Sequence, residues 1–250
     1  MIFFTDMDGT IIRSASKKHP GDLVIEYKDG CEITCISSDR AKILAELSDS
    51  VIPVTSRSIE QYKRIDIPGF MPKYALTSNG GNLLVSGIPD KDWSAWSIGI
   101  AEKHSAELAA CRKLLENDPD RSFEIRLVDG LFLFTKSNAP DKTLQDLSER
   151  LSDTVGLDLY NTGAKIYAIP KELNKGAAVK RLVDKLGCCK EKIVFAGDSI
   201  MDISMLECAD IAVYPDDMGL ELHGFSCSRG EFCEFTVNIF NRLRSNMLIQ

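Results

Sequence analysis

Two aspartates, one residue apart, follow the first apolar run of the sequence. Residues 5–10 read Thr-Asp-Met-Asp-Gly-Thr, so Asp6 and Asp8 come directly after the run at 2–5. An aspartate can attack phosphorus as a covalent nucleophile, and a second acid nearby can protonate the leaving oxygen and later activate water. Gly9 would permit the turn that aims both carboxylates at one small volume. The alternative is an acidic turn without chemistry.

A second pair of acids and a lysine occur much later in the chain. Asp198 follows the apolar run at 193–196, and Asp202 comes four residues after it. Mg²⁺ prefers a few carboxylates together with waters and substrate phosphate, so these residues are candidates for a cation site. Lys175 could neutralise the nucleophile and the transferring phosphoryl group. A single lysine at the start of a helix is, however, more often simply solvated.

The apolar run at 51–55 ends in polar residues that suit phosphate. Thr55 and Ser56 supply hydroxyls, and Arg57 supplies a guanidinium that can bind phosphoryl oxygens. This signal is weak by itself, because Thr and Ser are also ordinary residues at the start of a helix.

These candidates need a scaffold that brings the ends of separate runs together. Five short apolar runs, at 2–5, 51–55, 74–77, 193–196 and 211–214, are typical of strands buried on both faces of a parallel sheet. Helical patterns separate the runs, at 39–47, from 58 onward and at 175–186. The alternation predicts an α/β fold with a doubly wound parallel sheet, in which ligands bind beyond the carboxyl ends of the strands.

Two stretches interrupt this alternation. Asp-Gly at 29–30 lies between β-rich runs and predicts a hairpin over 23–36. Residues 83–170 predict a helix at 100–115, a strand pair around the Asp-Gly at 129–130, a helix at 143–151 and a second strand pair at 157–169. We interpret this stretch as an inserted α+β domain, with residues 1–82 and 171–250 forming the core. Apolar residues at helical spacing after 232 predict a final helix on the core.

Taken together, the motifs resemble those of the haloacid dehalogenase superfamily of phosphohydrolases. The pattern of that family is Asp-x-Asp-Gly-Thr, a strand that ends in Thr or Ser, a Lys, and Gly-Asp-x-x-x-Asp, and all four occur here in this order. An insertion between the second and third motifs is similar to the large cap of one subgroup. Asn79-Gly80 after the run at 74–77 agrees with that subgroup, which includes sucrose-phosphatase and other sugar-phosphate phosphatases, and the hairpin at 23–36 resembles the flap of the family.

The resemblance implies a role for each catalytic candidate. Asp6 would be the nucleophile, and Asp8 would be the general acid and base. Thr55 would hydrogen-bond the phosphoryl group, and Lys175 would balance charge. Because Asp8 offers a leaving-group acid, hydrolase or mutase chemistry is favoured over dehalogenation.

The resemblance also implies Mg²⁺ as cofactor. Its ligands would be Asp6, the backbone carbonyl of Asp8, Asp198 and Asp202, the last directly or through water. One departure is Met201, which occupies a position where many relatives have Asn. The carboxylates are unaffected, but any contact inferred for that amide is in doubt.

Substrate binding is expected from both domains. The core reads only the phosphate, so the inserted domain would decide specificity, and its opening and closing would admit substrate and exclude water. Trp93 and Trp96 could stack on a sugar, although their three-residue spacing is more typical of core packing. The predicted substrate-binding residues are Ser56, Arg57, Asn79, Gly80, Arg126 and Lys165, with Lys136 and Asn161 as further residues on or beside the inserted strands.

Composition limits the partners. With 37 acidic and 30 basic residues, the net charge of −7 disfavours nucleic-acid binding but does not exclude a small anion. No apolar run approaches the roughly 20 residues that span a bilayer, and no signal peptide is expected. The eight cysteines show no Cys-x-x-Cys pair, which favours free thiols in a reducing cytoplasm. We expect a cytoplasmic monomer or homodimer.

The predicted function is Mg²⁺-dependent hydrolysis of a small phosphorylated metabolite, with a sugar phosphate favoured, through an aspartyl-phosphate. One alternative is a phosphomutase of the phosphomannomutase type, which returns the phosphoryl group to sugar. Another is a non-catalytic protein that binds a phosphometabolite. The nucleophile and acid together argue against the latter, because a binding protein needs neither.

Overall fold

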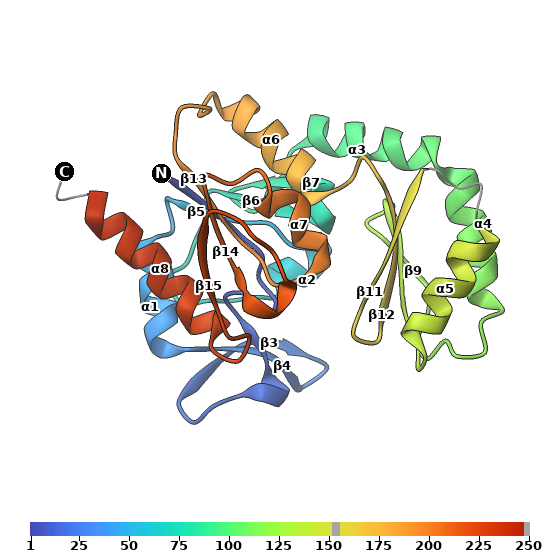
Figure 1. Ribbon diagram of the computed structural model, residues 1–250, viewed down its shortest axis with the longest axis horizontal. Coiled ribbons are helices and arrows are strands. Elements are labelled where there is room, and N and C mark those ends of the chain that lie inside the picture. Colours follow the sequence, from blue (N-terminus) through green and yellow to red (C-terminus); the bar gives the residue numbers. More distant parts are fainter. Residues whose placement is uncertain (152–155, 248–250) are drawn as a thin grey trace. The chain divides into compact units, whose positions relative to one another are not determined.

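The computed structural model describes residues 1–151 and 156–247 (Figure 1). The chain forms two compact units: the first comprises Met1–Pro89 and Lys175–Gln250, and the second comprises Asp90–Asn174. These boundaries differ from the predicted 83–170 at both ends. Residues 83–89 belong to the first unit because the strand at Asn82–Val85 pairs with the strand at Tyr74–Thr77 and continues its sheet.

A five-stranded parallel sheet forms the centre of the first unit, in the order β15-β14-β13-β1-β5. Its strands are β1 (Ile2–Thr5), β5 (Val51–Pro53), β13 (Ile193–Ala196), β14 (Ile211–Pro215) and β15 (Gly224–Cys227). The helices of this unit are η1 (Ala15–Lys17), α1 (Ser38–Glu46), α2 (Ile59–Lys63), η2 (Ser78–Gly80), α6 (Lys175–Leu186), η3 (Ile200–Asp202), α7 (Ile203–Leu206), η4 (Asp216–Met218) and α8 (Phe232–Met247).

Helices cover both faces of this sheet, α1 and α8 on one and α6 and α7 on the other (Figure 1). Alternate residues of β1 pack against the helices on the two faces of the sheet, since successive side chains of a strand point to opposite faces. Phe3 packs against Phe240 of α8, with ring centroids 4.7 Å apart, and Phe4 contacts Phe195 at 5.3 Å. Burial on both faces explains the continuous apolar runs and confirms the doubly wound α/β core.

Two strands differ from the sequence prediction. The run at 74–77 is not a full member of the parallel sheet. It forms β6 (Tyr74–Thr77) of an antiparallel sheet with β7 (Asn82–Val85) and β8 (Ile88–Pro89), and a single-residue bridge between Val54 and Leu76 joins it to the parallel sheet. The fifth parallel strand is β15, which the sequence did not indicate because it is a largely exposed edge strand without an apolar run.

The predicted hairpin at 23–36 is confirmed. Strands β3 (Asp22–Lys28) and β4 (Cys31–Ser37) pair antiparallel, and β2 (Arg13–Ser14) adds to β4. Asp29 and Gly30 both have positive φ, 51° and 78°. That conformation matches the twist of the flanking strands and is the reason Asp-Gly signals a hairpin.

The second unit has the predicted order of helix, hairpin, helix, hairpin. Its elements are α3 (Lys91–Lys103), α4 (Ser105–Glu116), β9 (Arg126–Val128), β10 (Phe132–Lys136), α5 (Pro140–Arg150), β11 (Leu157–Thr162) and β12 (Lys165–Pro170). The helix predicted at 100–115 is in fact two helices, separated at His104. The imidazole of His104 contacts the carboxylates of Glu107 and Glu172, a tertiary interaction that periodicity does not report.

Helices α4 and α5 pack on one face of the antiparallel sheet β11-β12-β10-β9 (Figure 1). Leu133, Ile166 and Ala168 of the sheet form a core with Leu108 and Leu147 of these helices. In residues 1–151 and 156–247, no helix is both long and apolar enough to cross a membrane.

Candidate active site

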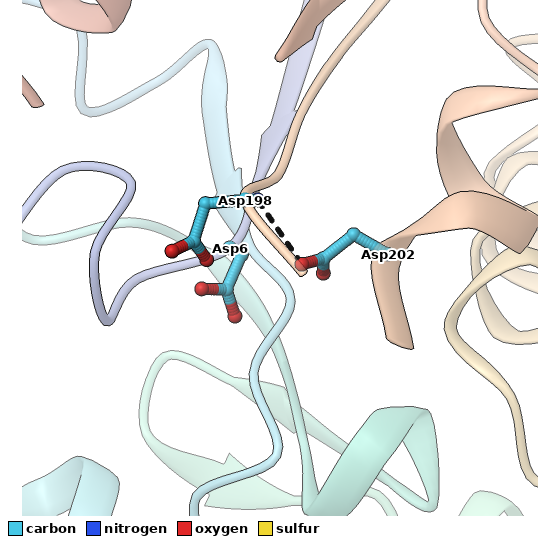
Figure 2. A group of neighbouring side chains, drawn as sticks. All are labelled: Asp6, Asp198 and Asp202. Atoms are coloured by element: carbon cyan, nitrogen blue, oxygen red, sulfur yellow. Dashed lines mark hydrogen bonds between the residues drawn. The ribbon is translucent and has the colours of Figure 1, made fainter. Parts of the chain in front are cut away.

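Three of the predicted acidic residues meet at the carboxyl ends of neighbouring strands. Asp6 follows β1, Asp198 lies after β13, and Asp202 ends η3. One carboxylate oxygen from each lies within 4.8 Å of the others, and Figure 2 shows the side chains of Asp6 and Asp198 next to each other with Asp202 across from them. Because β1 and β13 pair in parallel, their ends share one edge of the sheet.

Lys175 completes this cluster from the first residue of α6. Its side chain is 2% exposed, and its Nζ donates to Asp6 Oδ1 at 2.6 Å and to Asp202 Oδ1 at 2.5 Å. The next residue, Gly176, lets α6 approach α7 closely, since a Cβ there would lie 2.1 Å from the carbonyl oxygen of Ser204. A glycine at this position therefore brings the lysine to the two carboxylates.

Asp202 is the most constrained acid of the cluster. Its Oδ2 accepts from the backbone N–H of Asp198 (3.2 Å, the dashed line in Figure 2) and from the N–H and hydroxyl of Ser199 (2.9 and 2.7 Å). These bonds close the turn after β13, which explains the spacing Asp-x-x-x-Asp. Met201 is buried and places an apolar side chain at this turn.

Burial and mutual repulsion raise the pKa values of the clustered carboxyl groups. Burial raises the pKa of Asp6 to about 8; Lys175 lowers it, and Asp202, Asp198 and Asp8 raise it. Burial and Asp202 raise the pKa of Asp198 to about 6, although Arg229 and Lys175 oppose the shift. Three clustered carboxylates beside the Lys175 ammonium fit a divalent cation with oxygen ligands.

Asp8 is joined to Arg57 rather than to the cluster. The guanidinium donates from Nε to Asp8 Oδ2 at 2.6 Å and from Nη2 to Oδ1 at 2.7 Å. Arg57 also donates to Glu26 Oε2 at 2.8 Å and to Thr34 Oγ1 at 3.1 Å. Burial lowers the pKa of Arg57, but Asp8 and Glu26 outweigh burial and raise it. The sequence predicts Arg57 as a phosphate ligand, whereas here its donors bind protein groups.

Thr55 lies in the loop after β5, which is hydrogen-bonded to the segment that follows β6. Its side chain is fully buried, and Thr55 Oγ1 accepts from the N–H of Arg57 at 3.2 Å. Asn79 and Gly80 have positive φ, 58° and 88°, and the N–H of Asn79 donates to the carbonyl of Thr55 at 2.9 Å. Asn79 and Gly80 therefore shape this loop, beside which Ser56 is half-buried.

Arg126 and Lys165 lie in the second unit, on the sheet face opposite to α4 and α5. The pairing register puts Arg126 beside Phe134 and Lys165 beside Lys136, on the same face. The guanidinium of Arg126 lies over the ring of Phe123, 4.7 Å from its centroid. In the same unit Trp93 is buried in the core, whereas Trp96 is 46% exposed.

Several residues at the site were not predicted from the sequence. Glu26 of β3 is fully buried between Arg57 and Arg64, although an isolated Glu in an alternating strand is normally solvated. Thr10 Oγ1 lies 3.5 Å from Asp6 Oδ2 and 3.4 Å from Asp198 Oδ1. Arg229, from the loop before α8, contacts Asp198. Only Thr10 could have been found, because it ends the first motif.

The family model of haloacid dehalogenase-like hydrolases matches residues 74–214. The chain belongs to this family. No curated protein matches the sequence significantly.

Solved structures agree with this assignment at the level of the fold. A haloacid dehalogenase-like hydrolase from B. subtilis has a TM-score of 0.64 and 14% identity, over 97% of this chain and 99% of that one. The sucrose-phosphatase from Synechocystis, solved with sucrose and phosphate, has a TM-score of 0.63 and 16% identity, over 86% and 82% of the two chains. The C-terminal domain of the C. albicans trehalose-6-phosphate phosphatase has a TM-score of 0.62 and 14% identity, over 96% and 91%.

Proposed function

We propose that the protein is a Mg²⁺-dependent phosphomonoesterase for small phosphorylated metabolites, with sugar phosphates as the substrate class. The observation that carries the proposal is the buried bond from Lys175 to Asp6, inside a cluster with Asp198 and Asp202. Two of the structural neighbours are a sucrose-phosphatase and a trehalose-6-phosphate phosphatase, which supports the substrate class.

Asp6, Asp198 and Asp202 would hold the cation, together with the backbone carbonyl of Asp8. When bound, Mg²⁺ would offset the charge of the phosphoryl oxygens and favour the ionised form of Asp6. The residues themselves support this role, since the pKa of Asp6 is raised to about 8 by burial and a buried acid of this kind needs a cation to be fully ionised near neutral pH.

The reaction we propose has two transfers. In the first, a carboxylate oxygen of Asp6 forms a bond to phosphorus, and the electron pair of the ester P–O bond passes to the leaving oxygen, which takes a proton from Asp8. In the second, water gives a proton to Asp8 and attacks the aspartyl-phosphate, which releases phosphate and regenerates Asp6. Lys175 holds Asp6 Oδ1 in place and offsets negative charge during both transfers.

Asp8 must change partners to act in this way. In the conformation described, both of its carboxylate oxygens accept from Arg57. We propose that substrate binding separates one oxygen of Asp8 from Arg57 so that it can reach the leaving group. The second unit would supply specificity, and we propose that Arg126 and Lys165, on one face of its sheet, contact a polar, anionic metabolite.

Hydrolysis of a broad panel of sugar, nucleotide and polyol phosphates with Mg²⁺ tests the proposal. Wild-type protein should release phosphate from at least one ester, and Asp6→Asn and Asp8→Asn should lower kcat/KM by at least about a hundredfold. Failure to turn over any ester would refute the proposal. An isomeric sugar phosphate in place of free phosphate would identify a mutase, and tight binding without turnover would identify a binding protein.

A further inference from the structure

Arg229 connects the loops that follow three adjacent strands. It lies between β15 and α8, and its Nε and Nη2 donate to the two carboxylate oxygens of Asp217 at 2.7 and 2.8 Å. Asp217 belongs to η4, directly after β14. The remaining nitrogen, Nη1, donates to the backbone carbonyl of Asp198 at 2.8 Å and to its Oδ2 at 3.2 Å. All three nitrogens of the guanidinium thus bind acidic residues or their backbone.

These bonds fix which oxygen of Asp198 faces the cluster. Asp198 Oδ1 lies 3.4 Å from Thr10 Oγ1, which is also 3.5 Å from Asp6, so Oδ1 is on the side of the nucleophile. Asp198 Oδ2 lies between Arg229 and Gly9, where a Cβ on the glycine would be 2.3 Å away. Asp198 therefore presents one oxygen to the cluster and gives the other to Arg229.

Charge alone does not explain the presence of this arginine. A cation beside a cation site repels the metal, but Asp217 is paired to Arg229 through both oxygens and balances its charge. What remains is geometry: a planar guanidinium can bond two partners in fixed directions, which the ammonium of a lysine cannot do. Because Arg229 is 46% exposed, it needs Asp217 to keep it in one conformation.

We propose that Arg229, held by Asp217, is a positioning residue for the cation site. It fixes the Asp198 carboxylate in the orientation that offers Oδ1 to a divalent cation beside Asp6. This inference rests on the proposed function, since it assumes that the cluster binds Mg²⁺. It concerns the affinity of the metal-free protein for the cation, which can be measured without substrate.

The experiment is a titration with Mn²⁺ of the 250-residue protein, stripped of metal by EDTA and then freed of EDTA, in which electron paramagnetic resonance reports the free ion. Arg229→Lys keeps the positive charge but removes the planar guanidinium. Asp217→Asn keeps Arg229 but removes the carboxylate that holds it in one conformation. Each should weaken Mn²⁺ binding by about tenfold, as is typical when a group that orients a metal ligand is lost. Arg244→Lys is the matched control, because Arg244 lies near the other end of α8 and contacts the carbonyl of Glu46. It should bind Mn²⁺ like the wild type.

Three results would overturn the inference. If Arg229→Lys and Asp217→Asn bind Mn²⁺ like the wild type while far-UV circular dichroism shows them folded, the arginine does not position Asp198. If Arg229→Gln binds Mn²⁺ more tightly than wild type, the repulsion between the Arg229 charge and the cation is larger than any gain from orienting Asp198. If wild type binds no Mn²⁺, the proposed cation site and this inference both fail. Weaker binding in both variants, with the control unchanged, supports the inference whether or not a substrate has been found.

Discussion

Replacing Lys175 by methionine removes the ammonium that joins Asp6 to Asp202 while keeping the length and apolar character of the side chain. Breaking a buried ion pair by removing one partner costs about 3–5 kcal/mol. We expect the lower end, about 3 kcal/mol, because Asp202 keeps its three other donors and Asp6 can take up a proton. For a chain of this size that loss corresponds to a melting temperature lower by about 6–12 °C.

The assay is thermal unfolding followed by circular dichroism at pH 8 in EDTA, so that no cation replaces the ammonium. Lys142→Met is the matched control. Lys142 also makes an ion pair, with Asp120 at 2.7 Å, but its side chain is 61% exposed. Exposed pairs contribute little, so the control should melt at the wild-type temperature within error.

Lowering the pH provides a second test of the same reasoning. Without Lys175 the pKa of Asp6 rises further, because the lysine is the group that lowers it. Both proteins keep the Asp6 proton well below pH 8, and they differ in proton uptake only where wild-type Asp6 is ionised, so the deficit of Lys175→Met should shrink as the pH falls from about 10 to about 7. Equal melting temperatures for Lys175→Met and Lys142→Met at pH 8, or a deficit that grows as the pH falls from about 10 to about 7, would refute the argument.

Two further predictions follow from the same structure. In EDTA the wild-type protein should lose stability as the pH rises from about 4 to 8. Folded Asp6 and Asp198, with pKa values of about 8 and 6, keep protons that the same carboxyls release near 3.8 in the unfolded chain. Urea unfolding at several pH values would measure this loss, and a free energy of unfolding that does not change with pH would contradict it. Gly176→Ala should lower the free energy of unfolding by about 1–3 kcal/mol, because its Cβ would clash with the Ser204 carbonyl. Gly99→Ala, at an exposed position of α3 with open space, should instead raise the free energy of unfolding by about 0.5–1 kcal/mol. Equal effects of the two substitutions would show that the clash relaxes.

The chemistry of the cluster could be predicted from the sequence because it depends on local order. Asp6 follows one apolar run directly and Asp198 follows another after a single glycine, and parallel strands bring their carboxyl ends to one edge whatever the rest of the chain does. The hairpin turn at Asp29-Gly30 is equally local, since only the backbone preference of two residues is needed. The order of elements in the second unit followed from periodicity and turn residues in the same way.

Other features depended on contacts between distant residues. The run at 74–77 has the composition of a buried parallel strand, but antiparallel pairing with β7 competes for its hydrogen bonds and takes it out of the main sheet. The exposed edge strand β15 has no hydrophobic pattern, because only backbone pairing with β14 makes it a strand. The helix break at His104 likewise accompanies contacts to Glu172, far away in sequence.

The sequence by itself therefore determined the family, the doubly wound core and the acids that gather at its edge. Only the tertiary structure decided what each charged side chain binds. Arg57 donates to Asp8 and to the buried Glu26, and Arg229 donates to Asp198, across separations of 49, 31 and 31 residues. The physical reason is that a strand pattern specifies which backbone segments meet, whereas the partner of a long, flexible arginine depends on which carboxylates lie within its reach after the chain has folded.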